Sequence, residues 1–239
     1  MLLTEADDET NMAPVVMACM AAVGSTCREK VMKVFNASLH ILNLMISSSK
    51  IEASSDAMNI FRGQLLEENI IPRLLLKSEE SNTRLTNKIH ETLLDLSYHS
   101  KIGEDLVSQA IVIRIDDHQK NNKGNHKGLL AQLALLYKMI NSFGVKPIDT
   151  SPTSNTSTND SQQDTYTGSL TVSEVLAVSM PSIEHSNSDV KNAAIKIVLD
   201  VQRLTGKVKE YHYGLIVDKK IKDLIKEKVA AVSIQIEMN

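Results

Sequence analysis

Two segments of the chain share one pattern of apolar and polar positions. The segment SNTRLTNKIHETLLDL at 81–96 aligns without a gap with SNSDVKNAAIKIVLDV at 186–201. Four apolar positions in each copy recur at steps of four, four and three residues, which places them on one helix face. They are Leu85, Ile89, Leu93 and Leu96 in the first copy and Val190, Ala194, Val198 and Val201 in the second. Both copies open with a short polar turn that carries an Asn, a helix-capping residue, so helices are predicted at about 81–97 and 188–204.

Other apolar segments alternate with weaker copies of this pattern. The apolar segments lie at 14–23, 59–76, 102–115 and 170–186. Pairing each with the helix that follows gives second helices that begin near residues 26, 81, 126 and 187. This spacing approximates the period of about 40–47 residues in HEAT and armadillo repeats. We predict an all-α fold, an α-solenoid of HEAT-like helix pairs, with about eight to ten helices in antiparallel pairs. An irregular helical bundle is the alternative.

One low-complexity segment interrupts the helical pattern. Residues 147–168, PIDTSPTSNTSTNDSQQDTYTG, contain almost no apolar side chains. Such a segment buries too little surface to offset the entropy of ordering, so we expect a disordered insert within a single domain spanning 1–239. A phosphorylated or partner-binding loop is the alternative. The helical pattern resumes at Thr171-Val-Ser-Glu174, which has the spacing of a capping box.

The last apolar pattern predicts a helix that closes the array. In the segment at 218–236 the apolar residues recur at steps of three and four, while lysines fall largely off that face. The apolar residues are Ile221, Leu224, Ile225, Val229 and Val232. A terminal helix of a repeat array covers the last apolar face, so this helix is expected to be a cap.

Composition favours helix packing and argues against secretion or membrane insertion. Hydrophobic residues make up 42% of the chain, aromatic residues only 3%, and Trp is absent. The N-terminal sequence is acidic where a signal peptide is basic, and the apolar run at 14–23 is too short to span a bilayer. Cys19 and Cys27 form neither a disulfide framework nor a zinc pattern. These features predict reduced thiols, a cytoplasmic protein and no membrane partner.

The sequence contains no catalytic signature. The phosphate-loop, dinucleotide-binding and H-E-x-x-H patterns are all missing. Asp116-Asp117-His118 includes metal-ligating residue types, but spacing brings no further ligand to it, so we interpret it as a solvated loop. We therefore expect no enzyme activity, no cofactor and no metal. Nucleic-acid binding is disfavoured by the net charge of −3 and by the few aromatic residues.

Basic and amide side chains gather in the turns expected between paired helices. The four turns are GSTCREK at 24–30, SEESNTR at 78–84, DDHQKNNKGNHK at 116–127 and HSNSDVK at 185–191. In a helix-pair solenoid such turns align along one edge. This edge would suit an acidic protein surface.

The second and fourth turns carry a family resemblance. The segment SNTRLTNKIHETLLDLS and the segment at 172–212 resemble repeats of TOG domains, which are HEAT-like arrays that bind tubulin. The resemblance lies in the H-S-N-x-x-V-K-x-A-A turn, the I-V-L-D-V-Q-R helix and the G-K-V-K-E-Y tail. The resemblance extends over about 31–213. The TOG domains that the chain resembles include those of centrosomal and ciliary proteins. The resemblance implies a tubulin-binding module located in the cytoskeleton, at the centrosome or cilium.

In TOG domains the intra-repeat turns contact tubulin, and the resemblance carries this role to the turns of this chain. The implied contact residues are Arg28, Lys30, Asn82, Arg84, Lys123, Lys127, Asn187 and Lys191. Other centrosomal or ciliary proteins are further partners that the resemblance implies. Most TOG domains have a Trp in the first turn, which this chain lacks. The alternative is therefore a HEAT or armadillo adaptor for protein–protein interaction without tubulin affinity.

Overall fold

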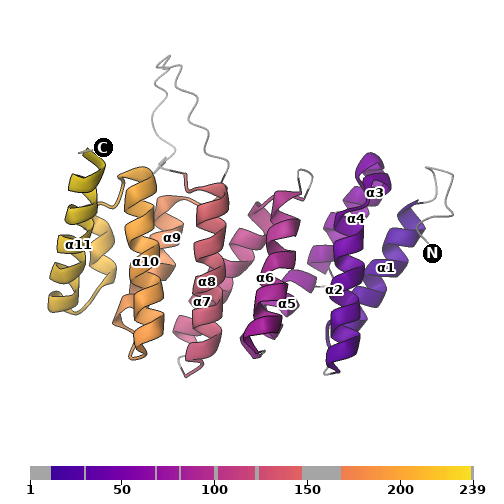
Figure 1. Cartoon of the computed structure of the whole chain (residues 1–239), viewed down its shortest axis with the longest axis horizontal. Helices are drawn as coiled ribbons and strands as arrows, with labels where there is room; N and C mark the ends of the chain where they lie inside the picture. The colour runs from indigo at the N-terminus through magenta and orange to yellow at the C-terminus, as the bar shows by residue number, and fades with distance from the viewer. Residues whose placement is uncertain are drawn as a thin grey trace, which may run out of the picture. The chain divides into compact units, whose positions relative to one another are not determined.

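The computed structural model describes residues 12–29, 31–67, 69–80, 82–99, 102–121, 124–146 and 168–237. These residues are mainly α-helical, and their one β-type pairing is an isolated bridge, which confirms the all-α class (Figure 1). They form eleven α-helices, slightly more than the eight to ten expected. The chain divides into two compact units, Met1–Ala110 and Ile111–Asn239. The predicted insert at 147–168 lies outside the described residues except for Gly168.

The first unit is built from helix pairs around an aliphatic core. Its helices are α1 (Met12–Thr26), α2 (Met32–Ile46), α3 (Ser49–Ala53), α4 (Ser55–Glu67), α5 (Ile70–Glu80) and α6 (Thr83–Tyr98), and α7 (Asp105–Lys120) begins in it. Helix α1 packs against α2 and α4, while α6 packs against α5 and α2. Phe35 and Phe61 are fully buried in this core.

Two boundaries in the first unit differ from those predicted. The apolar segment at 59–76 is divided between α4 and α5, and Asn69 between them has a φ of 51°, a left-handed conformation that Asn tolerates. Helix α1 continues through Gly24 to Thr26, so α2 begins at Met32 rather than near residue 26. Gly24 is buried within α1 and does not end it.

The second unit is arranged around α10. Its remaining elements are α8 (His126–Phe143), α9 (Val172–Ser179), the 3₁₀ helix η2 (Pro181–Glu184), α10 (Ser188–Thr205), the 3₁₀ helix η3 (Glu210–Leu215) and α11 (Lys219–Glu237). Helix α10 packs against α8, α9, η2 and α11. The capping box before α9 is present, with Glu174 N donating to Thr171 Oγ1 at 3.2 Å and Thr171 N donating to Glu174 Oε2 at 2.8 Å.

The repeat is confirmed in both units. Helices α6 and α10 begin and end within two residues of the predicted bounds. All eight aligned apolar side chains are buried: Leu85, Ile89, Leu93, Leu96, Val190, Ala194, Val198 and Val201. The four–four–three spacing therefore identified the packed face of each helix.

Helix α11 covers α10 as predicted, but its orientation is parallel to α10. Gln202, near the end of α10, donates from Nε2 to Ser233 Oγ near the end of α11 at 2.8 Å. The Ile225 and Val229 side chains of α11 are buried. Leu224, which the sequence placed on this face, is 48% exposed, because it lies about 100° around the helix from Ile225.

Candidate protein-interaction site

Three of the four turns predicted as a binding edge are held by asparagine caps. The side-chain oxygen of Asn82 accepts from Leu85 N at 3.1 Å, and that of Asn125 accepts from Gly128 N at 3.0 Å. Asn187 accepts from two backbone donors, at 2.9 and 3.2 Å. A capping side chain satisfies amide groups that the first helical turn leaves open. These asparagines therefore fix the geometry of the turns.

The absence of a side chain at Gly128 permits the cap of α8. A Cβ atom at this position would lie 2.5 Å from Asn125 Nδ2 and 2.8 Å from His118 Cε1. His118 is buried beneath the start of α8. The third turn is thus packed closely against the end of α7.

In the first unit, the turn before α2 lies on the same side as the turn after α5 (Figure 1). Lys77, near the end of α5, places Nζ 5.7 Å from the ring centroid of Phe35, near the start of α2. Arg73 Nη1 in α5 donates to the carbonyl of Gly24 in α1 at 2.8 Å. These contacts bring the two turns that carry Arg28 and Arg84 to one side of the unit.

In the second unit, the turn before α8 lies on the same side as the turn before α10. Gln119, near the end of α7, donates from Nε2 to Ser182 Oγ in η2 at 2.8 Å. Lys196 Nζ in α10 lies 4.0 Å from the ring centroid of Tyr137 in α8, so the two helices run alongside each other. The turns that carry Lys127 and Lys191 therefore neighbour each other.

Exposed cations occupy equivalent positions at three helix starts. Arg84 is the second residue of α6, Lys127 the second of α8 and Lys33 the second of α2, and all three side chains are exposed. None of the three forms an ion pair within the described residues. A cation in the first turn opposes the helix dipole. Helix stability therefore does not explain this repeated placement.

The sequence analysis missed Lys33 and the two apolar residues before it. Val31 is 56% exposed and Met32 is 41% exposed. Val31 occupies the N-cap position of α2 without a side-chain cap bond, where a Ser, Thr, Asp or Asn is preferred. The sequence predicts the first turn at 24–30, whereas α1 continues to Thr26 and the turn precedes Met32. If Val31 had been recognised as the uncapped start of a helix, the sequence would have identified Val31, Met32 and Lys33 as residues of the turn.

The remaining predicted contact residues differ in accessibility. Arg28 is exposed in the turn after α1, and Asn82 is exposed at its cap. Asn187 and Lys191 are both partly buried, whereas a contact residue of an exposed edge is expected to face solvent. Lys191 is the fourth residue of α10 and lies farther inside the helix than Arg84 in α6. Lys30 and Lys123 lie outside the described residues.

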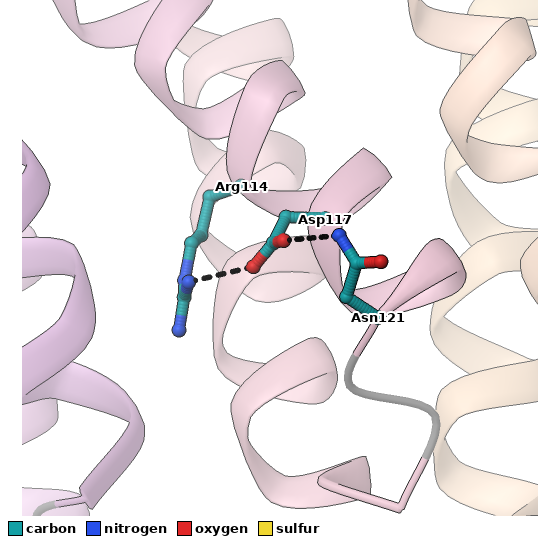
Figure 2. Close-up of polar contacts among 3 residues, drawn as sticks. All are labelled: Arg114, Asp117 and Asn121. Atoms are coloured by element: carbon teal, nitrogen blue, oxygen red, sulfur yellow. Dashed lines mark hydrogen bonds and ion pairs between the residues drawn. The ribbon is translucent and has the colours of Figure 1, made fainter.

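Asp116, Asp117 and His118 do not form the solvated loop that the sequence suggested. They belong to α7, near its C-terminal end. Figure 2 shows the carboxylate of Asp117 between Arg114 Nη1 and Asn121 Nδ2, each at 2.9 Å. Asp116 instead pairs with Lys120 at 2.7 Å, and the His118 ring is buried. Within the described residues, no group of three His, Cys, Asp or Glu side chains is placed to hold a metal ion.

Neither cysteine forms a disulfide. Both lie on or just after α1, and burial raises the pKa of the Cys27 thiol to about 11 despite the opposing effect of Arg73. A thiol with a raised pKa is poorly reactive at neutral pH. Among the described helices, none is both long and apolar enough to cross a membrane.

Consecutive helix pairs, with asparagine caps at three of the turns, define a HEAT-like α-solenoid module. Comparison with solved structures identifies its fold as that of a TOG domain. The chain superposes on the TOG domain of human Cep104 with a TM-score of 0.69 and 18% identity, covering 96% of this chain and 81% of that chain. A second structure of the CEP104 TOG domain gives a TM-score of 0.67 and 15% identity, covering 98% and 82%. No protein-family model and no curated protein matches the sequence.

Proposed function

We propose that this chain is a tubulin-binding TOG-type module of a centrosomal or ciliary protein, acting in the cytoskeleton and without enzymatic activity. The observation that carries the proposal is the repeated exposed cation at the starts of α2, α6 and α8. An acidic protein surface would accept charge-assisted hydrogen bonds from these side chains. Because asparagine caps already fix the turns before α6 and α8, binding there would require little ordering of the backbone.

In this proposal, apolar residues of the first turn make the contact that a Trp makes in most TOG domains. Val31 and Met32 are exposed at the start of α2, beside Lys33. An apolar residue next to unpaired cations combines burial with charge recognition in one contact. We therefore assign Val31 and Met32 as the apolar part of the edge and Arg28, Lys33 and Arg84 as its cationic part in the first unit.

The cations of the second unit have a matching role. Lys127 is exposed and forms no ion pair within the described residues, while Lys191 lies on the neighbouring turn. Lys30 and Lys123 keep the role that the resemblance implies. Lys127 and Lys191 would therefore form the cationic part of the contact in the second unit.

Size-exclusion chromatography with free tubulin at low and physiological ionic strength tests the proposal. The wild-type chain should co-elute at low salt and lose affinity as salt rises, because exposed charges are screened beyond about 8–10 Å. Charge reversal in Lys33→Glu/Arg84→Glu should abolish co-elution without changing the circular dichroism spectrum. Lys127→Glu should weaken it.

A matched variant distinguishes the edge from net charge. Lys50→Glu/Lys146→Glu makes the same charge change at exposed positions that follow the opposite ends of α2 and α8. This variant should bind like the wild type. Absence of wild-type binding at low salt would refute tubulin recognition and favour the adaptor function. Binding that survives Lys33→Glu/Arg84→Glu would show that another surface is used.

A further inference from the structure

Two exposed lysines and a leucine form a narrow strip along one face of α11. Lys220, Leu224 and Lys228 are spaced by four residues and therefore lie on one helix face. Both lysines are exposed, Leu224 is 48% exposed, and Val217 just before the helix is 87% exposed. We call Lys220, Leu224 and Lys228 the lysine–leucine strip.

The two lysines of the strip are available to a partner. Within the described residues neither forms an ion pair. Lys226, on the other side of the same helix, pairs with Glu210 and lies over the Tyr213 ring. Helix α11 thus has one lysine engaged in the fold, while Lys220 and Lys228 face solvent.

The start of α11 combines an acidic cap with lysines that the helix dipole disfavours. Asp218 caps the helix by accepting from the backbone N of Lys220 at 2.8 Å and of Ile221 at 3.1 Å. The first turn contains lysines and no acidic residue. Cations at this position oppose the helix dipole. A sequence that departs from local preference at exposed positions is expected where function requires it.

We propose that the lysine–leucine strip binds an extended acidic peptide with the pattern acid–x–apolar–x–acid. Four residues of α-helix advance about 6 Å, whereas two residues of extended chain advance about 6.6–7 Å. Alternate side chains of an extended peptide therefore match successive members of the strip. The two acidic side chains pair with Lys220 and Lys228, and the central apolar side chain packs on Leu224.

The chemistry of the strip favours a peptide over a membrane. An interfacial helix inserts a broad apolar face into lipid. The buried apolar side chains of α11, Ile225 and Val229, are instead packed within the unit. The exposed strip offers one leucine between two cations. Asp223 and Glu227 are exposed on the adjacent face and limit the basic surface to a narrow width.

Fluorescence anisotropy with the labelled peptide Gly-Glu-Ser-Leu-Ser-Glu-Gly tests the strip. Its affinity should exceed that of the analogue with both Glu replaced by Gln and that of the rearranged peptide Gly-Glu-Glu-Leu-Ser-Ser-Gly. Lys220→Glu/Lys228→Glu should weaken binding by about tenfold or more. Leu224→Ser should weaken it by about threefold to tenfold, since little apolar area is lost.

Thermal melting separates loss of binding from loss of structure. Because Lys220 lies in the first turn, Lys220→Glu/Lys228→Glu should leave the melting temperature unchanged or raise it by about 1–4 °C. The Lys50→Glu/Lys146→Glu control should bind the peptide like the wild type. The Lys33→Glu/Arg84→Glu variant should also retain peptide binding, because the lysine–leucine strip does not include the cations at the starts of α2 and α6.

Three outcomes would overturn the proposal. One is equal affinity for the Glu and Gln peptides. Another is peptide affinity that survives Lys220→Glu/Lys228→Glu. The third is binding to vesicles of phosphatidylcholine with phosphatidylserine that the peptide does not displace, which would assign the strip to an anionic membrane instead.

Discussion

Helices α6 and α10 are two copies of one sequence pattern, and they differ where they meet solvent. Both begin after an asparagine cap and bury four aligned apolar side chains. The second helical residue is Arg84 in α6 but Asp189 in α10, and both are exposed. The repeat thus preserves what packs and caps the helix. The exposed charge at its start differs between the copies, so it is the part free to serve a partner.

The two copies also differ in how well their starts are stabilised. Asn187 accepts from two backbone donors, whereas Asn82 accepts from one. Asp189 favours the positive end of the helix dipole and Arg84 opposes it. We therefore expect α10 to have the more stable start and α6 the start better suited to an acidic partner.

Removing residues 218–239 should have the largest effect and should separate the two copies. This deletion uncovers α10 but not α6, because α11 packs on α10. Loss of the buried Ile225 and Val229 contacts would cost about 3–6 kcal/mol. We expect aggregation or a large fall in melting temperature. An unchanged melting curve would contradict the capping role of α11.

Truncating one buried position in each copy tests whether their packed faces are equivalent. Leu93→Ala should lower the free energy of unfolding by about 2–5 kcal/mol, as in other cores. Val198→Ala should cost less because it removes two carbon atoms rather than three. Urea denaturation measures both. Lys88→Ala, on the exposed side of α6, is the control and should change stability by about 0.5 kcal/mol or less.

Removing each cap compares the two helix starts directly. Asn82→Ala should cost about 1 kcal/mol, and Asn187→Ala should cost more, up to about 2 kcal/mol, because it leaves two backbone donors without their partner. The midpoints of urea denaturation give the comparison. Equal losses would mean that the second bond to Asn187 adds nothing.

The sequence predicted the elements whose apolar periodicity is regular and missed those that depend on neighbours. The faces of α6 and α10 could be read from spacing alone. Gly24 resembles a helix stop but is buried inside α1, so the first turn was misplaced and Lys33 was missed. Asp116 and Asp117 look like loop residues, yet they lie in α7, where they form ion pairs with Lys120 and Arg114. Only the structure shows these contacts.

Exchanging the charges of the two copies should have the smallest effect on stability. Arg84→Asp places a favourable charge at the start of α6 and should raise stability by about 0.3–1 kcal/mol, while Asp189→Arg should lower it by a similar amount. Tubulin affinity should change in the opposite direction, falling with Arg84→Asp and rising with Asp189→Arg. Arg84→Gln and Asp189→Asn are the controls and should give intermediate values. If stability and affinity change in the same direction, Arg84 contributes to folding rather than recognition. Tubulin would then bind through another surface.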